Sequence, residues 1–177
     1  MDGIAIARSL AVAALLASPA AALAQTQNVK PRGNYPFVEI RDTQHRVVQG
    51  PVENNVVPLW PVRTCFGWVV TLPERNRTVD YVEIQRQPAP TRFTGGGFVA
   101  NETSDTTTRK ARAAIGKDGL LSHAWCVNDA DPEGEVRFEI HVEGRFVAEF
   151  RFCAVKLPAD APVRLGELTC PQKFLGS

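Results

Sequence analysis

Apolar residues recur at every second position between residues 135 and 155, and this alternation predicts a β-hairpin. One run spans Val136 to Val142 and the other spans Phe146 to Phe152. Opposed residues of an antiparallel pair share a face, so one register collects every apolar side chain on one side. Its pairs are Val142–Phe146, Ile140–Ala148, Phe138–Phe150 and Val136–Phe152. This register requires a three-residue connection or a bulge at Glu143 to Arg145, with Gly144 supplying backbone freedom.

The remaining alternating segments are short and separated by turn residues, which is typical of strands. We expect strands at 37–40, 46–49, 65–72, 78–85 and 120–127. The threonine run of 105–114 favours a strand, although its lysine, arginine and alanine residues leave a helix open. Gly116–Gly119 then predicts a hairpin turn, and 87–105 predicts a long loop containing three consecutive glycines. Many short strands without a convincing helix indicate an all-β, antiparallel sandwich of about 7–9 strands with irregular termini.

The C-terminal hairpin resembles bacterial immunoglobulin-like domains, in which two alternating strands flank a turn that contains glycine. The matching residues are Pro132-Glu133-Gly134, the row Val136 to Val142, and then Phe150, Phe152 and Val155. The resemblance covers about 30 residues and is to uncharacterised exported β-sandwich domains. It implies the fold and a binding, tethering or scaffolding role, and it brings no activity.

The first 24 residues predict a cleaved signal peptide. Arg8 precedes an apolar alanine-rich run that ends in Ala22-Leu23-Ala24, an arrangement typical of export leaders. No later run is long enough for a transmembrane helix, so we expect no membrane span after cleavage. The leader and the excess of arginine over lysine favour a bacterial periplasm, or secretion. We expect an N-terminal segment at 25–62 with one or two strands, a sandwich core at 63–157 and an irregular tail at 158–177.

Four cysteines in an exported chain favour two disulfides. Side-chain parity places Cys65, Cys126 and Cys153 off the main core face. In a simple meander, the strands of Cys126 and Cys153 would lie two steps apart, too far for a bridge. We therefore favour Cys65–Cys126 and Cys153–Cys170, although strands in different sheets would leave the other two connectivities open.

The sequence offers little catalytic or cofactor chemistry. The chain has 20 basic and 19 acidic residues, which gives no electrostatic footprint for nucleic acid. No nucleophile motif or paired metal-ligand spacing occurs, so we expect no catalytic residues and no cofactor. His123 and His141 could meet on neighbouring strands. The one metal hypothesis is calcium, which prefers oxygen ligands. The candidate ligands are Asn128, Asp129, Asp131 and Glu133.

These observations predict a non-catalytic binding or accessory module, with another envelope or secreted protein as its partner. The expected contact surfaces are the loops 87–105 and 128–134, or the edge of a β-sheet. The alternative is a carbohydrate-binding or hydrolytic envelope protein. It would use loop carboxylates and exposed aromatic residues such as Trp60 or Phe93.

Overall fold

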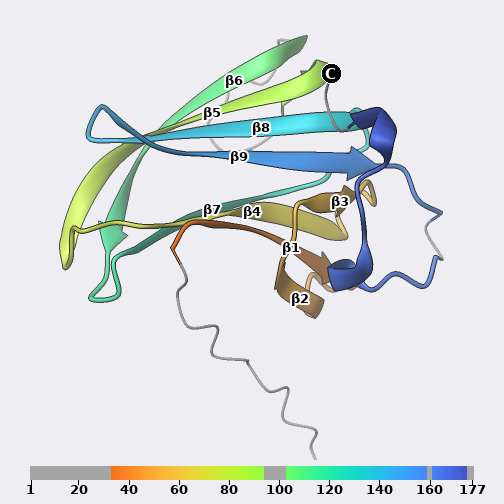
Figure 1. Ribbon diagram of the computed structural model, residues 1–177, viewed down its shortest axis with the longest axis horizontal. Coiled ribbons are helices and arrows are strands. Elements are labelled where there is room, and N and C mark those ends of the chain that lie inside the picture. Colours follow the sequence, from red (N-terminus) through yellow and green to blue (C-terminus); the bar gives the residue numbers. More distant parts are fainter. Residues whose placement is uncertain (1–32, 94–102, 159–160, 175–177) are drawn as a thin grey trace, which may run out of the picture. The chain divides into compact units, whose positions relative to one another are not determined.

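Side chains that alternate inward and outward build two facing sheets in the computed structural model, which describes residues 33–93, 103–158 and 161–174 (Figure 1). The four-stranded sheet has the order β2 (Val47–Glu53), β1 (Tyr35–Arg41), β4 (Thr64–Thr71) and β7 (Leu120–Cys126). The five-stranded sheet has the order β3 (Val56–Pro58), β9 (Arg145–Val155), β8 (Gly134–Val142), β5 (Arg77–Arg92) and β6 (Thr103–Ile115). Two short 3-10 helices follow, Leu165–Glu167 and Gln172–Phe174.

The chain enters the five-stranded sheet for the short strand β3 and returns to the four-stranded sheet at β4. It then changes sheets between β4 and β5, between β6 and β7, and between β7 and β8. As a result, β1, β4 and β7 form one layer while β5, β8 and β9 form the other, with β6 added at the edge. Immunoglobulin folds divide their strands between two sheets in the same way. Paired neighbours are antiparallel except β3 and β9, which run parallel. The expected all-β, immunoglobulin-like sandwich is therefore confirmed. Residues 35–58 supply three strands, against an expectation of one or two.

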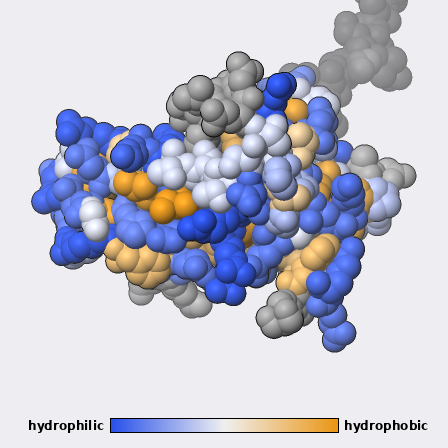
Figure 2. Space-filling view, turned by 90° about the horizontal axis from the view of Figure 1, so that it is seen from above, coloured by the Kyte–Doolittle hydropathy of each residue, from blue (hydrophilic) through white to orange (hydrophobic). Residues whose placement is uncertain are grey.

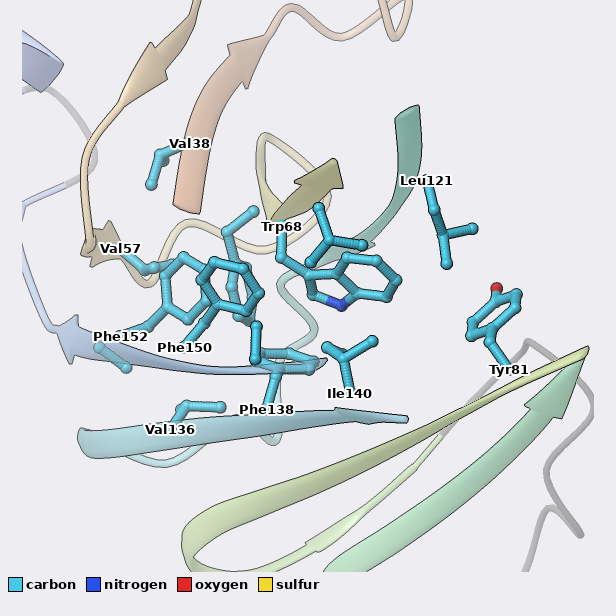
Figure 3. Close-up of a cluster of buried hydrophobic side chains, with 14 of the residues drawn as sticks. Val38, Val57, Trp68, Tyr81, Leu121, Val136, Phe138, Ile140, Phe150 and Phe152 are labelled. Carbon is cyan, nitrogen blue, oxygen red and sulfur yellow. The ribbon is translucent and has the colours of Figure 1, made fainter. Parts of the chain in front are cut away.

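Aromatic residues from both sheets meet in the core (Figure 3). The inward row of β4 includes Phe66 and Trp68, and the row facing it includes Phe138, Phe150 and Phe152. The ring centroids of Phe66 and Phe152 lie 5.2 Å apart in an edge contact, and Trp68 stacks on Phe150 at 6.3 Å. Burial of each large apolar side chain contributes about 1.5–3 kcal/mol, so this row is a principal source of stability.

The β8–β9 hairpin has the expected register over most of its length. Its observed pairs are Ile140–Ala148, Phe138–Phe150 and Val136–Phe152. The expected Val142–Phe146 pair is wrong, because Val142 pairs with Arg145 across a two-residue turn at Glu143–Gly144. Both turn residues have positive φ, 50° and 74°, which suits a tight hairpin turn. The register shift falls beyond the turn, between Phe146 and Ala148, and leaves Phe146 60% exposed.

The ambiguous segment forms β6, which pairs with β5 from Arg77 to Arg92. A helix here is therefore excluded. The expected hairpin at Gly116–Gly119 is wrong, because β6 and β7 belong to different sheets and this turn carries the chain from one to the other. The glycine run at 95–97 and the predicted signal peptide at 1–24 lie outside the described residues, and those predictions stay untested. None of the described helical segments has the length and hydropathy that a membrane crossing requires.

Both expected disulfides are present. Cys65–Cys126 joins directly opposed residues of β4 and β7, whose Cα atoms are 3.9 Å apart. Cys153–Cys170 joins β9 to the C-terminal segment with a Cα separation of 5.8 Å. It lies in a small apolar cluster with Val56 and Val155, on the face of β9 away from the main core. The parity rule placed the cysteines correctly, whereas the meander topology behind the choice of pairing was wrong.

We expect Gly67→Ala to destabilise the fold because β4 and β7 approach closely there. A Cβ at Gly67 would lie 2.1 Å from the carbonyl oxygen of His123 and 2.8 Å from the Cα of Ala124. Backbone atoms cannot move aside as a side chain does, so the loss should be about 1–3 kcal/mol or more. Urea unfolding measures it. Gly166→Ala, whose Cβ would have no neighbour nearer than 3.9 Å, is the matched control and should change stability by less than about 0.5 kcal/mol. Equal effects would contradict the prediction.

Candidate functional site

The inner face of β5 changes from apolar to polar along the strand. Val79 is followed at every second position by Tyr81, Glu83, Gln85 and Gln87, and each of these side chains is buried. The residues that β8 places beside them, such as Ile140 and Phe138, are apolar. Because buried polar groups must find partners inside the protein, this row is the first candidate site.

The carboxyl group of Glu83 is 1% exposed and joins the two sheets. Trp68 Nε1 donates to its Oε2 at 2.6 Å, and Trp125 Nε1 donates to its Oε1 at 2.6 Å. His123 Nδ1 lies 3.1 Å from Oε2. All three side chains come from β4 and β7, in the opposite sheet. Both carboxyl oxygens are therefore engaged, and the group is closed to solvent.

Tyr81 and Arg109 continue the polar row toward the edge strand β6. An Nη1 hydrogen of Arg109 is donated to the Tyr81 hydroxyl, and the guanidinium lies 5.5 Å from the ring centroid. Burial raises the pKa of Tyr81, and the hydrogen bond from Arg109 opposes that rise. The phenol thus stays protonated and serves as a neutral partner for the arginine.

A cavity of about 30 Å³ follows at the other end of the row, beside the loop that connects β7 to β8. Gln85, Gln87, Asn128 and Asp131 contribute polar groups to its lining. The Oε1 atoms of both glutamines are buried without a hydrogen-bond partner. Space of this size accommodates one water molecule, so the cavity is suited to solvent and not to an organic ligand.

Asp131 is held within its own loop. Its carboxylate accepts hydrogen bonds from the backbone N–H of Asn128 at 3.0 Å and from Asn128 Nδ2 at 2.8 Å. Thr91 Oγ1 donates to the carbonyl of Ala130 at 2.9 Å and fastens the loop to β5. Burial raises the pKa of Asp131, while the bonds from Asn128 lower it in part.

The second candidate site is an open groove of about 610 Å³ along β9. Residues Val147 to Arg151 line one side. Asn34 and Pro36, at the start of β1, line the other side, and Glu53 to Asn55 complete the lining. The groove exists because β3 pairs only with Cys153–Val155 of β9. Among the described strands, none pairs with β9 on this side ahead of Cys153.

Backbone parity gives this groove its chemistry. Cys153 donates its N–H to the carbonyl of Asn55, and the carbonyl of Val155 accepts from the N–H of Leu59. Cys153 and Val155 therefore direct these peptide groups away from β8. Alternate residues of a strand direct their peptide groups to the same side, and Glu149 and Arg151 therefore present N–H and C=O groups to the groove. Phe150, between them, and Ala148, just before Glu149, are buried.

The sequence-predicted calcium ligands have separate partners. Asp131 binds Asn128, whereas Glu133 accepts from the Lys156 backbone N–H at 3.4 Å and from Lys173 at 3.3 Å. Asp129 is exposed. The described residues hold no group of three or more His, Cys, Asp or Glu side chains that could bind a metal ion. The calcium site stays a prediction.

The aromatic and histidine residues singled out from the sequence lie differently from what was expected. Trp60 is 5% exposed and donates to the carbonyl of Leu157 at 3.1 Å, so it is not the exposed aromatic residue that a glycan site would use. Phe93 is half-buried beside the small cavity. His123 and His141 do not meet, because His123 approaches Glu83 while His141 binds Glu139 on the outer face.

Sequence reasoning missed the polar row of β5, and it named a sheet edge as a contact surface without identifying β9. The alternation of Tyr81, Glu83, Gln85 and Gln87 continues the parity of Val79, so the inward row could have been found from spacing alone. No local sequence pattern predicts the β9 groove, because the groove exists only where the short strand β3 does not pair with β9.

Two facing sheets with this strand order define an immunoglobulin-like β-sandwich protein. The chain belongs to the PM0630 beta sandwich domain family, whose model matches residues 35–155, from the start of β1 to the end of β9. A solved immunoglobulin-like protein from Pseudomonas aeruginosa is similar with a TM-score of 0.47 and 15% identity, over 68% of this chain and 91% of that chain. Comparison with curated proteins finds no match.

We expect substitution of Glu83 to weaken the contact between the sheets. Glu83→Ala leaves the Trp68 N–H buried without an acceptor and removes the acceptor of Trp125; each lost partner costs about 1–3 kcal/mol. Glu83→Gln keeps one carbonyl oxygen and should lose less. Chemical unfolding followed by tryptophan fluorescence measures the order. Glu167→Gln, whose parent side chain is 70% exposed, should be near neutral. If Glu83→Ala matches Glu167→Gln, the network contributes nothing to stability.

Asp131 should make the protein less stable as the pH rises. Its folded pKa lies above the ordinary value of 3.8, so its stabilising contribution is complete below that value and is lost as pH rises through the folded pKa. The unfolding free energy of wild type minus that of Asp131→Asn should therefore fall as the pH rises above 3.8 and through the raised folded pKa. Groups common to both proteins, such as Asp80 and Glu133, cancel in the difference. A difference that is constant with pH would contradict this assignment.

Proposed function

We propose that the protein is an exported, non-catalytic binding module that takes up an extended segment of another envelope or secreted protein along the edge of β9. The single observation that carries this proposal is the short reach of β3, which leaves the peptide groups of Glu149 and Arg151 open beside a groove. Addition of a strand to an open sheet edge is a common mode of protein recognition, because main-chain hydrogen bonds supply the affinity.

The polar character of the outer face of the five-stranded sheet favours an edge of the sheet, rather than this face, as the binding surface. In Figure 2 this face is largely hydrophilic, and its hydrophobic areas are small and separated from one another. Its ion pairs include Arg151–Glu149 at 2.7 Å and Arg112–Asp80 at 2.8 Å. Partner proteins that dock on a face usually cover a larger apolar patch. The two disulfides support an extracytoplasmic location, where such bonds persist.

The alternative is a carbohydrate-binding or hydrolytic protein, and the polar row inside β5 is the observation that favours it. A buried carboxyl group next to a histidine is a familiar arrangement in active sites. Here the Glu83 oxygens are already engaged by Trp68 and Trp125. Under the binding-module proposal, glycan arrays and hydrolase screens give no signal, and Glu83→Gln alters stability without altering partner binding.

Site-specific photo-crosslinking in the native compartment tests the proposal. A benzoylphenylalanine at Val147, which lines the groove, should give an adduct of defined mass. The same group at Arg137, exposed on the outer face of β8, should not. Glu149→Pro in the Val147 background should abolish the adduct, because proline removes an N–H that faces the groove and leaves the β8 ladder intact. Equal adducts at both positions, or no effect of proline, would overturn the proposal.

A further inference from the structure

The side chains around the open edge of β9 specify more than an extended backbone. Glu149 and Arg151 lie on the outer face, with side chains 38% and 57% exposed, and Phe150 between them points into the core with 6% exposure. Within three residues, the edge therefore presents an acidic group, an apolar inward position and a basic group. A strand added here meets all three.

Pairing geometry turns this order into a requirement on the partner. Residues directly opposed in antiparallel strands share a face, and antiparallel pairing is slightly more stable than parallel. A basic residue belongs opposite Glu149, an apolar residue opposite Phe150 and an acidic residue opposite Arg151. Because the partner runs in the reverse direction, its sequence reads acidic, apolar, basic.

The rest of the groove agrees with this pattern. Glu53 contributes to the lining and pairs with Phe37 of β1. The residues before and after Phe37, Pro36 and Val38, point inward, so Phe37 and its partner Glu53 point outward. The Glu53 carboxylate therefore belongs to the outer face of the other sheet, and Glu149 and Arg151 dominate the charge at the β9 edge. Pro36 and Ala148 provide apolar surface for the inward residue of the partner.

Strand β3 limits the length and the source of the segment. Asn55 already accepts the N–H of Cys153 at 2.7 Å, so an added strand must stop or bend after Arg151. A second copy of this chain carries the order Glu149, Phe150, Arg151, which would satisfy the charges. Its Val147, however, would then fall opposite Cys153, where Val56 of β3 already lies. A separate segment with a free end avoids that collision.

We propose that the β9 groove recognises an extended, antiparallel segment of a partner protein with the local order acidic–apolar–basic. The inference rests on the proposed function and names the chemistry of the partner. Each opposite-charge pair across two strands contributes roughly 0.2–1 kcal/mol. Two such pairs correspond to about a two- to thirtyfold preference over the charge-reversed order.

Two capped peptides of identical composition provide the test. One begins with Glu-Val-Lys and the other begins with Lys-Val-Glu, and each continues with four threonines, so that no residue of the peptide falls opposite Cys153. NMR titration of the disulfide-bonded mature protein should give a lower Kd for Glu-Val-Lys by about two- to thirtyfold, with shifts centred on Ala148–Arg151. The double variant Glu149→Arg with Arg151→Glu should invert the preference. The matched swap Asp80→Arg with Arg112→Asp, an exposed pair on β5 and β6, should leave it unchanged.

The outcomes separate this inference from the function on which it rests. If Glu149→Pro abolishes the crosslink at Val147 but both peptides bind equally, or neither binds, the charge order is wrong while strand addition stands. If proline has no effect on the crosslink, the proposed function itself fails. A dimer in sedimentation equilibrium that Glu149→Pro dissociates would identify a second copy as the occupant and overturn the inference.

Discussion

The register between β8 and β9 is the constraint on which the other features of the sandwich depend. The shift between Phe146 and Ala148 compensates for the two-residue turn at Glu143–Gly144. Without it, Phe150 and Phe152 would face solvent, since a slip of one residue reverses every side chain. The same shift places Glu149 and Arg151 on the outer face with their peptide groups toward the groove. One bulge therefore determines which side chains of β9 fill the core and which lie on the outer face beside the edge.

Glu83 shows how the other half of the interior is held together. The apolar row of β8 packs against Phe66 and Trp68, but β5 brings a carboxyl group where another apolar residue would suffice. Trp68 and Trp125 fill the space with their rings and satisfy the carboxyl group with their N–H groups. A buried polar group with all its partners is costly to disturb and admits few alternative packings. Polar contacts thus fix how the two sheets align, while apolar contacts supply most of the stabilisation.

Local alternation predicted the class of fold, most strands, three of the four core pairs in the hairpin and the face on which the strand cysteines lie. The disulfide pairing was right, although the meander used to choose it was wrong. The errors arose where local pattern carries no information about distant neighbours. Gly116–Gly119 has the composition of a hairpin turn, but β7 pairs with β4 and so the turn crosses between sheets. Trp60 was expected to be exposed, whereas its indole N–H donates to the carbonyl of Leu157, far along the chain. The β9 edge depends on the length of β3, which tertiary contacts decide.

An open edge is ordinarily a hazard, because unpaired peptide groups attract other strands, and charged residues at edges usually oppose that association. Glu149 and Arg151 meet this need, since an apolar strand that pairs with β9 would remove water from their ion pair without adding a partner for either charge. A segment with the complementary order converts the same two charges into favourable pairs. Protection against unselective pairing and recognition of one kind of segment can therefore come from the same residues. Selectivity of this kind requires that the edge be short, and β3 ensures it by closing the groove immediately after Arg151.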